Sequence, residues 1–190
     1  MALVVGTNCG FVPVAPTEDP LGVASWLYDN YAIAAKHVAP AGATGVTEVG
    51  WWADNATEAA NYQVGIYSHD SVNNRPKNLL ASTADIAKGT TAGWKTGTIS
   101  CAITAGDTYW IAMVCDNTAT ATFGNDASDG TQKADYLVQN TPFVDPWTAD
   151  GTDTRILSVY AVYTTAAGGG VGAIKRFGGV PHVAVNRGVW

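Results

Sequence analysis

Short apolar runs separated by turn residues are the feature that most limits what this chain can fold into. They recur between residues 31 and 163, with Gly, Asn, Asp and Pro between them. In 62–67 every even position is Tyr, Val or Ile, an alternation typical of a strand with one buried face. The expected strands are Tyr31–Val38, Val46–Ala53, Tyr62–Tyr67, Leu79–Ile86, Trp94–Ile103, Thr108–Cys115, Thr120–Gly124, Tyr136–Val138 and Ile156–Tyr163.

Many short strands without a convincing amphipathic helix predict an all-β fold. We expect an antiparallel two-sheet β-sandwich of the jelly-roll type. Turn sequences such as Ala105-Gly106-Asp107 and 71–76 support this prediction. The weakest helix candidate is Asp19–Asn30, for which we expect one turn of helix at most.

Composition excludes several other classes. With 21 Gly and 8 Pro the chain has too many helix breakers for a helical bundle. Only 14% of the residues are charged, but seven Trp and eight Tyr favour a packed core over disorder. No apolar run approaches the roughly 20 residues of a membrane span. A chain of 190 residues suggests one domain with extensions.

Three blocks follow from the distribution of Pro and Gly. Residues 1–30 contain Pro13, Pro16 and Pro20 and are expected to form an irregular N-terminal arm. Residues 31–165 form the sandwich. Residues 166–190 begin with the glycines at 168–170, which predict a flexible joint, and continue as an apolar and basic C-terminal arm.

Charge is unevenly placed along the chain. All sixteen acids lie at or before Asp153 together with six of the ten Lys and Arg, so that stretch carries a net charge of −10. The remainder carries four cations and no acid. A basic tail on an acidic body suits docking onto a like subunit or another acidic surface, although four cations over 37 residues also fit ordinary solvation. A body of this charge disfavours nucleic acid as a partner.

The N-terminal sequence and the cysteines bear on the compartment. The first residues lack a basic region followed by a long apolar stretch, so we expect no signal peptide. This fits a protein made in the host cytoplasm that reaches the outside as part of a particle. Cys9, Cys101 and Cys115 form an odd set without zinc-type spacing. Cys101 and Cys115 lie in apolar runs, where we expect free buried thiols.

A family likeness covers about 70 residues from Val46 to Asn117. Its elements follow one another as Val-Gly-Ile-Tyr-Ser at 64–68, Pro-Lys-Asn-Leu-Leu-Ala-Ser at 76–82, Gly-Trp at 93–94 and Thr-Ala-Gly-Asp-Thr-Tyr-Trp-Ile-Ala at 104–112. This order resembles jelly-roll sandwich domains of phage and other virion structural proteins, and of carbohydrate-binding modules. The segment 174–190 is similar to the closing segments of small phage structural proteins. The resemblance implies the fold rather than one function, because sandwiches serve many.

Catalytic and metal sites are poorly supported by the sequence. The three His are far apart, and there is no nucleophile elbow and no phosphate-binding loop, so we do not expect an enzyme. Loops of Asp, Asn and Gly suit calcium, which takes six to eight oxygen ligands, but ordinary turns explain them better. The weak calcium candidates are Asp126, Asp129, Asp150 and Asp153.

Two functions remain. The first is a capsid decoration or cement protein that assembles with copies of itself and with a shell protein. The second is a carbohydrate-binding or host-adhesion module, for which Trp51, Trp52 and Trp147 are the possible ligand platforms. Trp51 and Trp52 are adjacent and must face opposite sides of a strand, and Trp147 lies in the loop 141–153, where no core demands it. The expected assembly residues are the apolar anchors Phe177, Val180, Val183, Val185, Val189 and Trp190 and the cations Lys175, Arg176 and Arg187.

Overall fold

The structure is a computed structural model. It describes residues 10–12, 24–27, 31–53, 60–116, 122–126, 131, 134–138, 141–154 and 156–166. These residues form fourteen strands and, among themselves, no helix. The strands are β1 (Gly10–Val12), β2 (Ala24–Leu27), β3 (Tyr31–Val38), β4 (Ala43–Ala53), β5 (Asn61–Asp70), β6 (Arg75–Ser82), β7 (Ile86–Ala87), β8 (Gly93–Ala102), β9 (Thr108–Cys115), β10 (Thr122–Asp126), β11 (Ala134–Val138), β12 (Gly151–Asp153), β13 (Ile156–Leu157) and β14 (Val159–Thr165).

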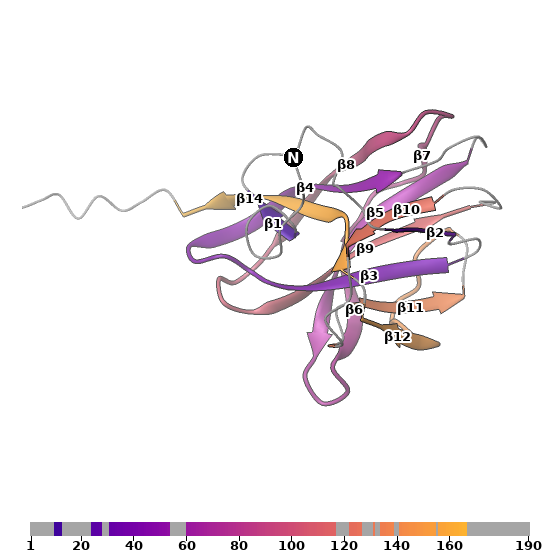
Figure 1. Ribbon diagram of the computed structural model, residues 1–190. Coiled ribbons are helices and arrows are strands. Elements are labelled where there is room, and N and C mark those ends of the chain that lie inside the picture. The colour runs from indigo at the N-terminus through magenta and orange to yellow at the C-terminus, as the bar shows by residue number, and fades with distance from the viewer. Residues whose placement is uncertain are drawn as a thin grey trace, which may run out of the picture.

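Two seven-stranded sheets pack against each other as a β-sandwich (Figure 1). The first sheet has the order β1-β14-β4-β10-β13, with β8 on the other side of β4 and β2 paired to β10. The second sheet has the order β12-β11-β3-β9-β5-β6, with β7 also on β5. The chain crosses between the sheets at each step from β2 to β5, at each step from β7 to β11, and from β12 to β13. The two-sheet prediction is confirmed, and the jelly-roll connectivity stays a prediction.

The strand predictions hold best where a long apolar run is bounded by turn residues. β3 and β9 coincide with the expected residues, and the turn before β9 has Gly106 at a φ of 84°. The run 79–86 is divided, because β6 and β7 are separate strands on β5. The run 156–163 is likewise divided between β13 and β14.

The N-terminal block departs from expectation. It is not wholly irregular, because β1 and β2 lie within residues 1–30 and join the first sheet. Residues 24–27 pair with β10 as a strand, so the helix candidate 19–30 was wrong there. β1 pairs with β14 in parallel, an exception to the antiparallel pairing that we expected throughout. No alternating pattern in the sequence predicts these short strands, because pairing with distant strands rather than a local pattern stabilises them.

The main core lies between the sheets. Its largest members with less than 2% exposure include Trp51, Ile33, Ile66 and Ile111. Cys101 and Cys115 are free buried thiols in the same core, as predicted. Burial raises the pKa of Cys115 to about 12, so this thiol stays protonated and packs in the core as a small apolar side chain.

A second apolar cluster covers the outer face of the second sheet. Tyr67 and Trp110 project there from β5 and β9, and Phe143 and Trp147 reach them from the segment 141–150. The central strands of this sheet are therefore buried on both faces, which explains why 109–115 is a nearly continuous apolar run. We call this the outer-face cluster: Ala32, Ala34, Tyr67, Trp110, Ala112, Val114, Leu137, Phe143 and Trp147.

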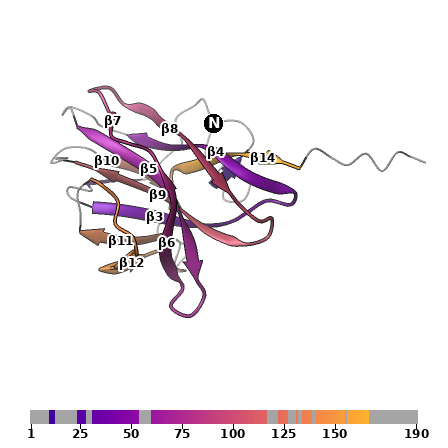
Figure 2. The ribbon, with the colours of Figure 1, turned by 180° about the vertical axis from the view of Figure 1, so that it is seen from behind.

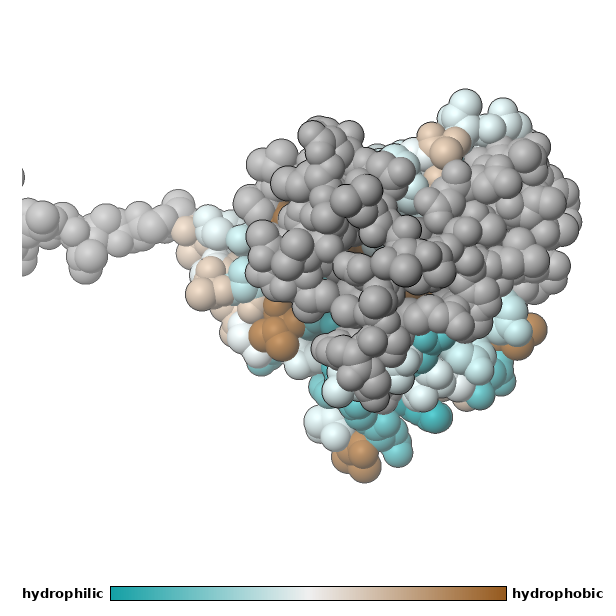
Figure 3. Space-filling view, viewed as in Figure 1, coloured by the Kyte–Doolittle hydropathy of each residue, from teal (hydrophilic) through white to brown (hydrophobic). Residues whose placement is uncertain are grey.

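Large apolar side chains on the described surface are scattered. Figure 3 shows brown residues singly rather than as one patch on the face it displays. The described part of the chain contains no helix with the length and apolarity needed to cross a bilayer. The exposed large hydrophobic residues are Val38, Val72, Leu80 and Val138.

Candidate functional site

The expected assembly residues lie in the tail, outside the described residues. The last described residue is Ala166, whose N–H donates to the carbonyl of Gly42 at 3.0 Å. The anchors Phe177, Val180, Val183, Val185, Val189 and Trp190 and the cations Lys175, Arg176 and Arg187 all follow it. Their roles stay predictions.

Trp147 is not an exposed platform, so that prediction was wrong. Its side chain is 7% exposed, and its ring centroid lies 5.0 Å from that of Tyr67. Its indole Nε1 donates to Asp135 Oδ1 at 2.7 Å, and its backbone N–H donates to the carbonyl of Lys77 at 2.8 Å. The loop lies across an apolar sheet face that needs a cover, and Trp147 supplies a large part of that cover.

Asp135 is a buried charge that sequence reasoning missed. Its side chain on β11 is fully buried, and Arg75 Nε lies 3.7 Å from Oδ2. Burial raises the pKa of Asp135 to about 6, although the Trp147 hydrogen bond and the Arg75 charge oppose that shift. Oδ2 accepts no hydrogen bond from the described residues. Asp135 therefore links the β5–β6 hairpin, β11 and the 141–150 segment at one polar point inside apolar surroundings.

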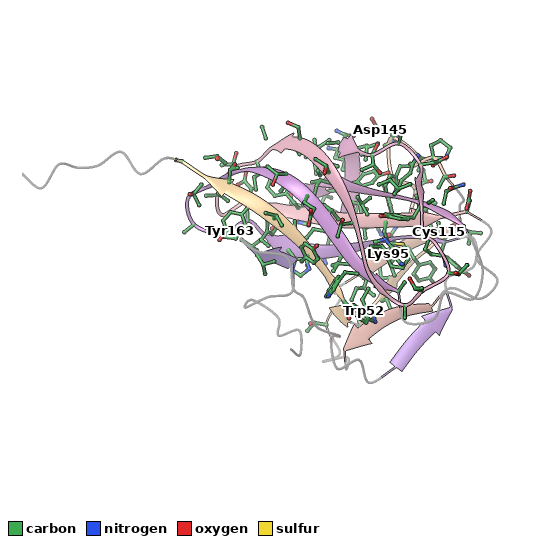
Figure 4. All side chains as sticks on the ribbon, turned by 90° about the horizontal axis from the view of Figure 1, so that it is seen from above. Trp52, Lys95, Cys115, Asp145 and Tyr163 are labelled. Atoms are coloured by element: carbon green, nitrogen blue, oxygen red, sulfur yellow. The ribbon has the colours of Figure 1, made fainter. Side chains whose placement is uncertain are left out.

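Trp51 and Trp52 face opposite sides of β4, as predicted. Trp51 is fully buried between the sheets, at 5.6 Å from the ring of Tyr62, so its role as a ligand platform was wrong. Trp52 is half-buried on the outer face of the first sheet and meets Trp94 edge to face at 5.4 Å. Figure 4 shows Trp52 and Asp145 on opposite sides of the molecule. A ligand-binding role for Trp52 stays a prediction.

Tyr160 extends this aromatic group on the first sheet. Its ring lies 5.0 Å from that of Trp94, and its hydroxyl donates to Glu48 Oε1 at 2.8 Å. Burial and the Glu48 hydrogen bond raise the pKa of Tyr160, which stays protonated. The ring of Tyr160 lies directly over Gly50, where an added Cβ would overlap it.

Gly50→Ala is expected to lower the free energy of unfolding by about 1–3 kcal/mol, because overpacking shifts side chains or backbone. Urea unfolding measures this as a lower transition midpoint. The matched control is Gly50→Ala combined with Tyr160→Leu, in which the smaller side chain relieves the overlap and the two effects are not additive. An unchanged midpoint in the single variant contradicts the close contact.

The calcium candidates do not converge in the described residues. Asp150 Oδ2 accepts a hydrogen bond from the Val138 N–H at 2.6 Å, and Asp153 belongs to β12. The side chain of Asp126 and the whole of Asp129 lie outside the description. No group of three His, Cys, Asp or Glu suited to a metal is present among the residues described.

His69 also serves the fold. Its Nδ1 accepts a hydrogen bond from Trp110 Nε1 at 3.0 Å, and Lys36 Nζ lies 5.9 Å from the Trp110 ring centroid. Burial and the Lys36 charge lower the pKa of His69. The imidazole thus accepts the hydrogen bond of a buried indole and helps to hold Trp110 in place within the outer-face cluster.

The sheet margins differ in how they end. The β6 margin is covered by the 141–150 segment, because Trp147 N–H binds the Lys77 carbonyl and Leu79 N–H binds Asp145 Oδ1 at 3.0 Å. β6 also carries Pro76 and pairs with β5 through two register shifts. The other terminal strands have two to four residues each: β1, β2, β7, β12 and β13. Covering, Pro, charge and short length are the usual protections against unwanted strand pairing.

The β8 margin is long, has no Pro and has no cover among the described residues, although it carries Lys95 and one register shift against β4 near Ile99 and Ser100. β8 has ten residues and pairs only with β4 among the described strands (Figure 2). We call residues Thr96–Ala102 the open edge. They include no Pro and no charged residue. Thr96, Thr98, Ser100 and Ala102 are exposed, while Gly97, Ile99 and Cys101 are buried. This margin is the part of the described surface most suited to receive another strand.

Sequence reasoning missed the open edge and Asp135. The only local signal for the edge was the absence of Pro and charge in 96–102, and none pointed to Asp135. Comparison with known proteins adds no assignment: no family model matches the chain, and neither the curated proteins nor the solved structures yielded a match.

Proposed function

We propose that this chain is a non-enzymatic structural protein of a virion, of the decoration or cement kind, and that it assembles through its terminal segments. Its partners are copies of itself and a shell protein. The observation that carries this proposal is the open edge, a long margin strand without a cover among the described residues. An uncovered strand of this length is a liability in an isolated molecule and a binding surface in an assembly.

The composition of the tail supports the same proposal. Residues 167–190 carry three cations and no acid, with five Val, one Phe and a terminal Trp. Apolar residues gain free energy when another surface covers them. The acidic body of a second copy supplies the complementary charge.

The rival proposal is binding of a surface glycan. It loses support because Trp51 and Trp147 are both buried. It now depends on Trp52, which packs edge to face on Trp94, and Trp94 packs in turn on Tyr160. Packing explains these aromatic residues without a ligand.

Mass spectrometry of virus particles from the source of this chain tests the proposal. Particles are purified on a density gradient, and the chain is expected as a stoichiometric component that co-migrates with the shell protein. A glycan array probed with the full-length chain is the counter-test, with Trp52→Ala as the control for any signal. Absence from particles together with a glycan signal that Trp52→Ala removes contradicts the structural role.

A further inference from the structure

The open edge of β8 is a margin at which a further strand could pair. Ile99 and Cys101 pack in the core, and β4 pairs with the inner side of the strand from Gly93 to Ala102, with one register shift at Ile99 and Ser100. The exposed side chains Thr96, Thr98 and Ser100 are small and polar. Outward N–H and C=O groups on such a strand give main-chain affinity to an added strand with few demands on its side chains.

We propose that the open edge binds residues 182–187 of a second copy of this chain as an additional strand. This inference rests on the proposed function and names the contact that would build the assembly. The segment is His-Val-Ala-Val-Asn-Arg and follows Pro181. Val183 and Val185 are two residues apart, so as a strand they share one face, and β-branched residues favour strands. On the open edge that face continues the one formed by Ile99 and Cys101.

The length of the chain beyond Ala166 favours a second copy over the same molecule. Thr165 pairs with Ala43, and Ala102 pairs with Gly45, so β14 and β8 end at the same end of the first sheet. An added strand beyond β8 lies three strand spacings from β14, or about 14 Å. A loop of about 4–6 residues suffices for such a return. Residues 167–181 can instead span about 50 Å when extended, which suits a neighbouring molecule.

Charge complementarity favours the same occupant. The stretch up to Asp153 carries a net charge of −10, and the four charged residues after Asp153 are all cations. Arg187 closes the proposed strand, and Lys175 and Arg176 precede it. A cationic strand therefore approaches an acidic body, which raises the rate of encounter between copies. Two acidic bodies repel each other, and this repulsion opposes pairing of two open edges with each other.

Hydrogen–deuterium exchange of the full-length chain tests this inference across a dilution series. Amides of the peptide that contains 96–102 are expected to exchange about tenfold more slowly in concentrated than in dilute protein, because association adds hydrogen bonds at the edge. Val183→Glu with Val185→Glu should abolish this slowing. Thr98→Lys, an exposed change on the edge itself, should abolish it too. Val72→Glu is the matched control, because Val72 is 88% exposed on the β5–β6 hairpin, and it should leave the slowing intact.

Three results overturn the inference. Slow exchange that is independent of concentration and lost in the tail variant means that the tail binds its own molecule. Fast exchange at every concentration means that nothing binds the edge, and slowing that survives the tail variant means that another segment does. Particle composition separates these failures from a failure of the proposed function, because a particle component without edge protection refutes only the strand contact.

Discussion

Trp147→Ala is expected to lower the free energy of unfolding by about 3–5 kcal/mol, the range for removal of a large buried aromatic side chain. The indole packs on Tyr67 and covers the second sheet, so its loss leaves a cavity over β5 and β9. It also removes the hydrogen bond to Asp135 Oδ1 and leaves that buried carboxylate without its donor. Urea unfolding followed by circular dichroism measures the change.

Trp147→Phe separates the two contributions. A phenyl ring keeps most of the apolar cover but lacks the donor, so its cost should be smaller, at about 1–3 kcal/mol. Val138→Ala is a surface control, since Val138 is 60% exposed on the neighbouring strand β11. A Trp147→Ala variant as stable as the unaltered chain contradicts the buried position of this side chain.

The free energy of unfolding is expected to fall as the pH rises from about 4 to about 6 because of Asp135. Burial raises the pKa of Asp135 from 3.8 to about 6, so the folded chain binds this proton more tightly than the unfolded chain. The stabilisation by the proton is complete below the lower pKa and lost above the higher one. Its size is at most about 3 kcal/mol, because one pKa unit corresponds to about 1.4 kcal/mol.

Asp135→Asn isolates this contribution. His69 and Asp70 have lowered pKa values and give stability that is lost as the pH falls, which is the opposite trend. The difference between the urea-unfolding curves of the unaltered chain and Asp135→Asn removes their shared contribution. Arg75→Gln is a second check, because loss of the cation beside Asp135 should raise its pKa further and extend the effect to higher pH. A difference curve that is flat from pH 4 to 7 contradicts a buried carboxyl.

The strands could be predicted because their pattern is local. Alternation in 62–67 and the apolar runs at 31–38 and 108–115 depend on which side of a strand each residue faces, and that follows from backbone geometry. The same geometry correctly placed Trp51 and Trp52 on opposite faces of β4. It could not say what covers each face, and this is why Trp147 and Trp51 were assigned the wrong environment.

What the sequence by itself determined is the set of main strands, the sandwich and the free thiols, since all three depend on periodicity and apolar content within short windows. Only the tertiary structure decided that the 141–150 segment covers the second sheet, that Asp135 is enclosed beneath it, and that β8 rather than β6 has an edge without a cover among the described residues. These outcomes depend on contacts between residues far apart in the chain. A local pattern carries no information about which distant segment arrives at a given face or margin, because that choice is made by the packing of the whole molecule.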